Sequence, residues 1–350
     1  MEVFPMRKTA LFCLLFCLLI SVPVFSEDPL PINIGDLQAT MDKFATELAL
    51  SLPFNSSMGL NWSDAHIGQL IDKKPPFFHF GVGFSAGFTT MELGSFNTLI
   101  NYFAPALPEW VLDFGGFPLP GYAVEARIGG IILPFDVGVK FGILPIKAEL
   151  FRKLDYTLAG ADFRFRLLED KGAAPGISVG VGVNYLKGGL GMTAGTDTSI
   201  AYQYPDLSDP DHPTMNDAIL TLKAPELDLF WETASLDFKV QISKKIAIIT
   251  PYLGLGASNG WSNAGYKVTT TIEDTGGNID FDTLRTLMST FGLEDFSEDG
   301  FGSTAEFTGW SFRVYGGFSI NLPFIRIELT GLYNFIDKKY GATIGARFQI

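Results

Sequence analysis

Cysteine is almost absent from this 350-residue chain, and its two cysteines, Cys13 and Cys17, both lie within the first 26 residues. Histidine is scarce as well, with three residues. After residue 26, no apolar stretch reaches the roughly 18 residues that a membrane-spanning helix needs. For the rest of the chain we therefore expect no disulfide, no thiolate metal site and no transmembrane helix.

Basic residues are in the minority, with 25 Lys and Arg against 38 Asp and Glu, a formal net charge of −13. So acidic a chain repels phosphate backbones, and we expect no nucleic-acid partner. Gly-x-Ser-x-Gly occurs at residues 83–87 and 256–260, but both matches fall in strand-like alternating segments and neither stands at a strand-to-helix elbow. The sequence has no phosphate loop. The acidic run Asp206, Asp209 and Asp211 lacks the spacing of a calcium-binding helix–loop–helix site, which favours a solvated loop. We expect no enzyme activity, no metal and no cofactor.

The first 26 residues have the three parts of a secretory signal peptide. Arg7 and Lys8 form a short basic start, and residues 10–20 are an apolar run too short to span a bilayer as a helix. Val24 and Ser26 then stand at the minus-three and minus-one positions of a small-residue cleavage site. We predict cleavage after Ser26 and export of the remaining chain.

What the chain does contain is a period-two alternation of apolar with small or charged residues, which indicates strands whose two faces meet different surroundings. The last strand shows it without a break, since Tyr340, Ile344 and Phe348 share one face. Thr343 and Arg347 share the other face. We predict ten such strands, in residues 77–90, 121–133, 135–144, 155–169, 177–187, 227–243, 245–258, 305–321, 324–336 and 340–350.

These strands predict an all-β fold, an antiparallel transmembrane β-barrel over residues 77–350. The alternative is a soluble β-sandwich, whose polar face would be rich in Lys, Glu and Thr. Here the polar face consists mostly of Gly, Ser and Ala with isolated charges of both signs, which is typical of a lumen. Further β-like pieces either extend neighbouring strands or raise the strand count to twelve or fourteen: residues 196–204, 218–223 and 266–273.

Charges on the inside of a barrel pair with one another or meet water. In a narrow barrel they would form a packed network that blocks passage, whereas in a wider barrel they would line a channel or hold a plug. The strand phase places the following charges in the lumen: Glu125, Arg127, Asp136, Lys140, Asp162, Arg164, Arg166, Asp237, Lys239, Arg313, Arg326, Glu328 and Arg347.

Alternate connections between the predicted strands are short and the others are often long. This is typical of outer-membrane barrels, which have short periplasmic turns and long extracellular loops. An even strand count then places both chain termini in the periplasm. We predict a protein of the outer membrane of a Gram-negative-type (diderm) bacterium, with outer-membrane lipid and the barrel-assembly machinery as partners.

The segment ahead of the first predicted strand, residues 27–76, is expected to form a helical plug inside the barrel or a periplasmic lid beneath it. The apolar spacing of Leu37, Met41 and Leu52 predicts a helix, with Asp36 as the candidate N-cap. A second short helix is predicted over residues 61–70. A helix packed on the barrel rim, with no role in transport, fits the same spacing.

The first predicted outer loop, residues 91–120, is unusually apolar for a water-facing segment. A helical plug, an apolar outer loop and a closing strand together resemble the outer-membrane transporters for long-chain fatty acids and aromatic hydrocarbons. The last strand, with Phe348 and a terminal Ile350, also resembles the carboxy-terminal insertion signal of outer-membrane barrels. In the transporter family an amino-terminal hatch plugs the lumen and apolar loops capture the ligand. The Asn-Pro-Ala signature of that hatch is absent from residues 27–60.

The resemblance implies passive transport of a small hydrophobic, fatty-acid-like molecule, gated by the amino-terminal segment. The alternative is a non-transporting surface or structural barrel that displays long extracellular loops, as an adhesin does. A general aqueous porin is a third hypothesis. Under the transport hypothesis the residues expected to contact the ligand are Phe44, Leu48, Phe96, Leu99, Phe103 and Trp110.

Overall fold

A computed structural model describes residues 34–68, 79–91, 117–131, 133–146, 152–193, 197–206, 214–224, 226–269, 271–275 and 301–350. The predicted signal peptide and almost all of the predicted apolar outer loop lie outside these residues. Within them, no helix has both the length and the apolar character needed to cross a membrane.

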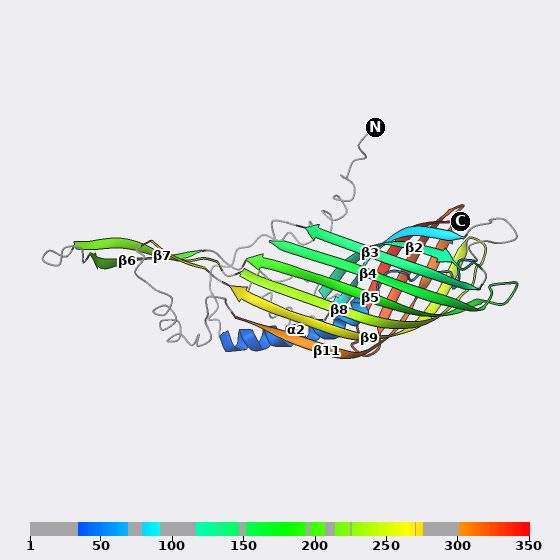
Figure 1. Cartoon of the computed structure of the whole chain (residues 1–350), viewed down its shortest axis with the longest axis horizontal. Coiled ribbons are helices and arrows are strands. Elements are labelled where there is room, and N and C mark those ends of the chain that lie inside the picture. The colour runs from blue at the N-terminus through cyan, green and yellow to red at the C-terminus, as the bar shows by residue number, and fades with distance from the viewer. Residues whose placement is uncertain are drawn as a thin grey trace, which may run out of the picture.

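Ten strands close into one antiparallel barrel, which confirms the predicted fold class and strand count (Figure 1). Each barrel strand pairs with the barrel strands before and after it, and β1 closes the circle by pairing with β13. The barrel strands are β1 (Phe80–Met91), β2 (Phe117–Gly129), β3 (Phe135–Ile146), β4 (Lys153–Leu168), β5 (Gly176–Thr193), β8 (Glu226–Ser243), β9 (Ile249–Thr269), β11 (Phe301–Asn321), β12 (Ile325–Asn334) and β13 (Tyr340–Gln349).

Side chains alternate between the lumen and the outer surface along the barrel strands. In β8, Phe238 and Val240 are 42% and 50% exposed, whereas Asp237 and Lys239 are buried. The outer surface is therefore apolar over a much larger area than water-soluble monomers expose. Apolar residues that point outward include Phe84, Val124, Phe141, Val183, Leu255, Phe312, Leu329 and Ile344.

The barrel has two unlike ends. At the turn mouth, short connections join β2 to β3, β4 to β5, β8 to β9 and β11 to β12. β1 begins and β13 ends at this mouth, where the Ile350 N–H donates to the Phe80 carbonyl at 3.1 Å. From the opposite end, the loop mouth, a small sheet of β6 (Thr198–Asp206), β7 (Thr214–Leu222) and β10 (Ile272–Asp274) projects away (Figure 1). The extra β-like pieces thus add no strand to the barrel.

Helix α2 (Ile34–Ser56) lies inside the barrel and contacts β8, β9 and β11 most extensively. Met41, Leu48 and Leu52 are buried at helical spacing and pack on the wall. The predicted N-cap at Asp36 is wrong, because the helix already includes Ile34. An acidic residue is favourable both at a cap and in the first helical turn, so the sequence did not separate the two positions.

Residues 57–67 continue from α2 toward the turn mouth without helical structure, so the predicted second helix is wrong for its described residues 61–68. Gly59 and Leu60 adopt positive φ values of 83° and 57°, which change the direction of the chain. The N–H groups of Ser63, Ala65 and Ile67 then donate to wall side chains instead of to carbonyls one helical turn back. Strong acceptors on the wall therefore replace the hydrogen bonds of a helix.

Candidate functional site: a plugged lumen with two zones

Residues 34–67, which we call the plug, run through the lumen from the loop mouth to the turn mouth. Near the loop end of β9, the Tyr266 hydroxyl donates to Asp42 at 3.0 Å. At the turn end of β8, the Ala65 N–H donates to the hydroxyl of Ser243, the last residue of that strand, at 2.9 Å. The wall that surrounds the plug changes in character between these two points.

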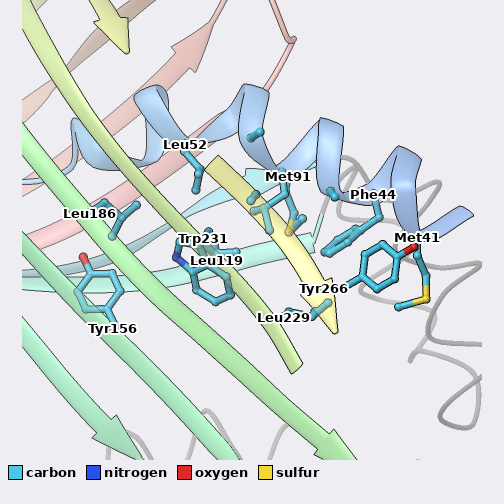
Figure 2. Close-up of a cluster of buried hydrophobic side chains, with 14 of the residues drawn as sticks. Met41, Phe44, Leu52, Met91, Leu119, Tyr156, Leu186, Leu229, Trp231 and Tyr266 are labelled. Carbon is cyan, nitrogen blue, oxygen red and sulfur yellow. The ribbon is translucent and has the colours of Figure 1, made fainter. Parts of the chain in front are cut away.

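The apolar zone is the half of the lumen nearest the loop mouth. Its wall residues occupy the same lumen-facing positions as the charged residues nearer the turn mouth. On β8, for example, Leu229 and Trp231 face the lumen as Asp237 does. Figure 2 shows side chains of α2, including Phe44 and Leu52, directed at this wall. Apolar burial stabilises the contact by about 25 cal/mol per Å². The zone and the helix residues packed on it are Met41, Phe44, Ala45, Leu48, Ala49, Leu52, Met91, Leu119, Ala123, Tyr156, Leu158, Leu186, Met192, Leu227, Leu229, Trp231, Ala264, Tyr266 and Val268.

The end of α2 fits closely against the middle of the wall. The hydroxyl oxygens of Ser56 and Ser235 lie 2.9 Å apart in a hydrogen bond. Pro53 packs where β9 carries Gly260, and a Cβ at Gly260 would lie 2.4 Å from the Pro53 Cγ. This position needs glycine because the helix approaches the strand there without room for a side chain.

The charged zone is the half of the lumen nearest the turn mouth, and its wall carries pairs of opposite charge. Arg127 of β2 lies 2.5 Å from Asp136 of β3 and 2.7 Å from Asp162 of β4. Arg164 lies 2.8 Å from Asp136, and Lys239 lies 2.5 Å from Asp162. These five side chains are buried, so removal of one partner leaves an uncompensated charge at a cost of about 3–5 kcal/mol.

A second wall pair joins β11 to β8. Arg313 of β11 donates from two nitrogens to Asp237 of β8, at 2.8 and 2.9 Å. Ser258 of β9, between the two strands, also donates to Asp237 at 2.7 Å. Paired wall charges of both signs are thus tied across neighbouring strands, which stiffens the lower half of the barrel.

The plug adds its own carboxylate, Asp64, to the charged zone. Asp64 accepts hydrogen bonds from Arg347 at 2.6 Å and from Arg326. Arg347 also donates to Glu328 at 2.7 Å, and the same Glu328 accepts the Ser63 N–H at 2.6 Å. The arginines of β12 and β13 therefore bind the plug and the wall together.

Trp62 of the plug lies between two wall arginines. The Arg347 and Arg127 guanidinium carbons are 4.4 and 5.5 Å from its ring centroid, within the range of cation–π attraction. Its Nε1–H donates to Glu125 at 2.5 Å, and Ser85 donates to the same carboxylate. The indole thus fills the lumen while its one polar atom is satisfied.

Backbone carbonyls of the plug accept hydrogen bonds from the wall as well. Lys140 Nζ donates to the carbonyls of Ser56 and Met58 at 2.8 and 2.5 Å. Gln241 Nε2 donates to the carbonyl of Trp62 at 2.8 Å. Residues 56–67 are therefore hydrogen-bonded along their length, whereas α2 is held mainly by apolar contact.

His66 lies in the plug near the turn mouth and packs against charged wall residues. Its Nδ1 accepts the Gly68 N–H at 3.0 Å, and its Nε2 has no hydrogen-bond partner among the described residues. Burial lowers the pKa of His66 to about 4. Asp136 opposes this decrease, and Arg164 and Arg166 add to it. The ring is therefore neutral at neutral pH.

The plug and the charged zone pack closely. The cavity beside Trp62 and Glu125 measures about 10 Å³, enough for about one water molecule. Among the described residues, no group of three or more His, Cys, Asp or Glu side chains has an arrangement suited to a metal ion.

The predicted site residues fall into three groups. Phe44 and Leu48 lie on α2 in the apolar zone, with 2% and 1% of their surface exposed. The predicted lumen charges all occupy inward positions, with Arg166 and Arg326 only partly buried. The remaining predicted ligand contacts lie outside the described residues: Phe96, Leu99, Phe103 and Trp110.

Sequence reasoning did not single out Trp62, Asp64 or the apolar wall. The alternation along β8 contains the signal for this wall. Every second residue from Lys239 and Asp237 back to Trp231 faces the lumen, so Trp231 could have been assigned to it. Asp64 is the one acidic residue between Glu47 and Asp72, but no local spacing marks it as an anchor.

Comparisons with known proteins add little about activity. A family model described as a family of unknown function (DUF6588) matches residues 198–350, and no curated protein matches the chain. Ail, the attachment invasion locus protein of Yersinia pestis, is 11% identical, with 78% of this chain and 97% of that chain covered and a TM-score of 0.23. The Ralstonia pickettii toluene transporter TbuX is 8% identical, with 78% and 89% covered and a TM-score of 0.26. The CymD monoaromatic hydrocarbon channel is 9% identical, with 77% and 87% covered and a TM-score of 0.21.

TM-scores below 0.5 do not carry a function from these structures to this chain. The class of the protein is defined instead by its own fold, an antiparallel barrel of ten strands with an apolar outer face and a lumen filled by its amino-terminal segment. This is the architecture of a β-barrel that spans a membrane.

Proposed function

We propose that the protein is an outer-membrane barrel that lets small hydrophobic, fatty-acid-like molecules pass, and that the plug is its gate. The plug occupies the lumen along its length, so passage requires the plug to move. The proposed ligand takes the place of α2 in the apolar zone when the gate opens.

The dimensions of the outer surface support a membrane location. Outward residues of β9 remain mostly apolar from Ile249 to Trp261. Twelve residues span roughly 40 Å of strand, or roughly 30 Å along the barrel axis at the usual tilt of about 40°. Aromatic rings lie toward both ends of this apolar band. The ring centroids of Phe324 and Phe348 lie 6.2 Å apart near the turn mouth. Trp310 stacks on Phe312 nearer the loop mouth. Aromatic girdles of this kind flank the apolar band of outer-membrane barrels.

The observation that carries the transport proposal is the apolar zone. Barrel interiors that pass water-soluble solutes are polar, yet Leu158, Leu186 and Leu229 turn inward here and are buried. A wall of this kind favours apolar contents, which are supplied by α2 while the gate is closed. An apolar molecule could replace the helix without leaving wall hydrogen bonds unsatisfied, because the helix makes few of them.

A reversible crosslink tests whether the plug must move. Ser56→Cys with Ser235→Cys would place two thiols where the hydroxyls are now 2.9 Å apart, close enough for a disulfide after small adjustments. The expected result is uptake of a labelled fatty acid by the reduced variant and at least a tenfold loss on oxidation, reversed by a thiol reductant.

A matched control carries its disulfide outside the barrel. Ser199 and Thr221 of the β6–β7 hairpin have hydroxyl oxygens 3.0 Å apart, so Ser199→Cys with Thr221→Cys adds the same chemistry away from the lumen. Oxidation of this control should leave uptake unchanged. Equal uptake by the oxidised and reduced Ser56/Ser235 variant would overturn the gate.

A second function is favoured by the charged zone. Its wall pairs and its bonds to the plug have the character of a fixed core, which suits a closed surface barrel that displays its long loops. In that case deletion of residues 27–60 would change neither the permeability of liposomes nor fatty-acid uptake. A large rise in liposome permeability after the deletion would count against this second function.

A further inference from the structure

The direction in which the plug crosses the barrel fixes where its first turns lie. Asp42 of α2 accepts the Tyr266 hydroxyl, three residues from the loop end of β9 (Ile249–Thr269). Twenty-three residues later, Ala65 bonds to Ser243 at the turn end of β8. The plug therefore runs once through the barrel, from the loop mouth down to the turn mouth.

The seam is the pairing of β1 with β13. β1 begins and β13 ends at the turn mouth, whereas α2 begins at the loop mouth. β1 starts at Phe80 and β13 ends beside it, with the Ile350 N–H donating to the Phe80 carbonyl. Figure 1 shows the beginning of α2 at the end of the barrel that carries the β6–β7 hairpin, and the carboxyl terminus at the other end. The first described residue, Ile34, and the last, Ile350, are separated by the length of the barrel.

The first turns of α2 are also open to solvent at the loop mouth. Lys43 has 69% of its side chain exposed, and Ala39 and Thr46 are exposed as well, whereas Ala49 deeper in the lumen has none of its surface exposed. Exposed ion pairs lie at the same mouth, where Arg152 bonds to Asp228 at 2.6 Å and also to Glu226, and these side chains are about two-fifths exposed.

We infer that the barrel is threaded by its own amino-terminal segment, so that α2 presents its first turns among the loops, on the opposite side of the membrane from Ile350. The protein thereby exports the amino-terminal end of its plug and displays it at the loop face, where a partner or protease outside the barrel can reach it. For the described residues, this differs from an arrangement in which the first turns of α2 and Ile350 face the same side of the membrane. The inference rests on the proposed membrane-spanning barrel, but not on transport or on movement of the plug.

Single thiols test this topology. Cysteine replaces Lys43 at the start of the plug, Lys153 at the loop end of β4 (61% exposed) or Lys171 in an exposed turn at the turn mouth. Cys13 and Cys17 are replaced by alanine, so that each full-length protein carries one thiol. Intact and permeabilised cells are treated with a membrane-impermeant maleimide.

We expect Lys43→Cys to label together with Lys153→Cys, and at least ten times faster than Lys171→Cys in intact cells. Permeabilisation should remove that difference. Ala49→Cys, buried in the same helix, should stay unlabelled, which shows that labelling reports position and not unfolding.

Labelling of Lys43→Cys together with Lys171→Cys, and not with Lys153→Cys, would overturn the threaded topology while leaving a gated barrel intact. Equal labelling of Lys153→Cys and Lys171→Cys in intact cells would mean that the barrel does not separate two compartments. In that case the membrane-spanning barrel and this inference fail together. A loss of fatty-acid transport alone bears only on the gate.

Discussion

The carboxylate of Asp64 lies 2.6 Å from Arg347 Nη2, and through this contact the plug supplies a negative charge to the charged zone. The Arg347 side chain is 1% exposed and that of Asp64 is 15% exposed. Loss of one partner of so buried a pair leaves the other charge uncompensated. We therefore predict that Asp64→Asn loosens residues 57–67 at the turn mouth.

The loosening is measured as the rate at which a thiol reagent modifies Ala65→Cys, next to the substituted residue. Ala65 is 2% exposed in the folded protein. A local destabilisation of about 3 kcal/mol corresponds to a roughly hundredfold faster reaction. Asp228→Asn is the control, because its pair with Arg152 is exposed at the loop rim and contributes about 1 kcal/mol or less. An unchanged Ala65→Cys rate in the Asp64→Asn protein would refute the ionic anchor.

A single added methyl group tests the seat of α2. Gly260→Ala would place its Cβ 2.4 Å from Pro53 Cγ, so the helix has to shift away from β9. Overpacking of this kind costs about 1–3 kcal/mol, and we expect Ala49→Cys to react roughly tenfold faster or more. Gly331→Ala adds the same methyl on β12, where the nearest heavy atom is 3.9 Å away, and should leave the rate unchanged. Equal rates for the two variants would contradict the close seat.

Apolar packing, and not hydrogen bonding, should set the stability of α2. Leu48→Ala removes a side chain that is 1% exposed inside the apolar zone. The cavity should cost about 2–5 kcal/mol, measured as faster hydrogen exchange of the α2 amides. Lys43→Ala, at a position 69% exposed, serves as the control and should leave exchange unaltered. Protection that survives Leu48→Ala would show that other contacts hold the helix.

Acid should weaken the turn-mouth end of the plug through His66. Burial holds its pKa at about 4, below the ordinary value of about 6.5, so the neutral ring is favoured in the folded state. Its stabilising contribution is complete above pH ~6.5 and is lost as the pH falls toward ~4, by at most about 2 kcal/mol between pH 8 and pH 5. His66→Asn keeps an acceptor and cannot titrate.

The measurement is the thermal denaturation midpoint in detergent micelles at pH 8 and pH 5. The wild type should lose more of its midpoint than His66→Asn does over this range. Asp136, Arg164 and Arg166 face the ring and remain in both proteins, so their own response to pH cancels in the comparison. Identical losses in the two proteins would remove His66 as the cause.

The barrel itself could be predicted from the sequence because its signal is repeated. Each strand exposes one face to an apolar surrounding and one to the lumen, so residues such as Phe238 and Lys239 alternate for physical reasons that a short window reveals. The strand ends were less accurate. β9 was predicted to end at residue 258 but reaches Thr269, because β-pairing continues beyond the part of the strand where the two faces differ in polarity.

The plug could be placed only in part. Helical spacing predicted α2, since that pattern is local. The path of residues 57–67 is set by acceptors and donors from distant strands, such as Glu328 for the Ser63 N–H. No sequence window contains both partners of such a contact. The depth and direction of the plug therefore follow only from the folded structure.

The seam between β1 and β13 joins the first barrel strand of the chain to the last one. β1 follows the plug in sequence, and its last partner is the final strand, paired from Gly81 with Gln349 to Thr89 with Gly341. An empty closed barrel would hold Arg347, Arg326 and Lys140 without the acceptors that the plug provides. These side chains therefore have their plug acceptors at closure only if the plug, which precedes β1 in the chain, is already in the lumen when β13 pairs with β1.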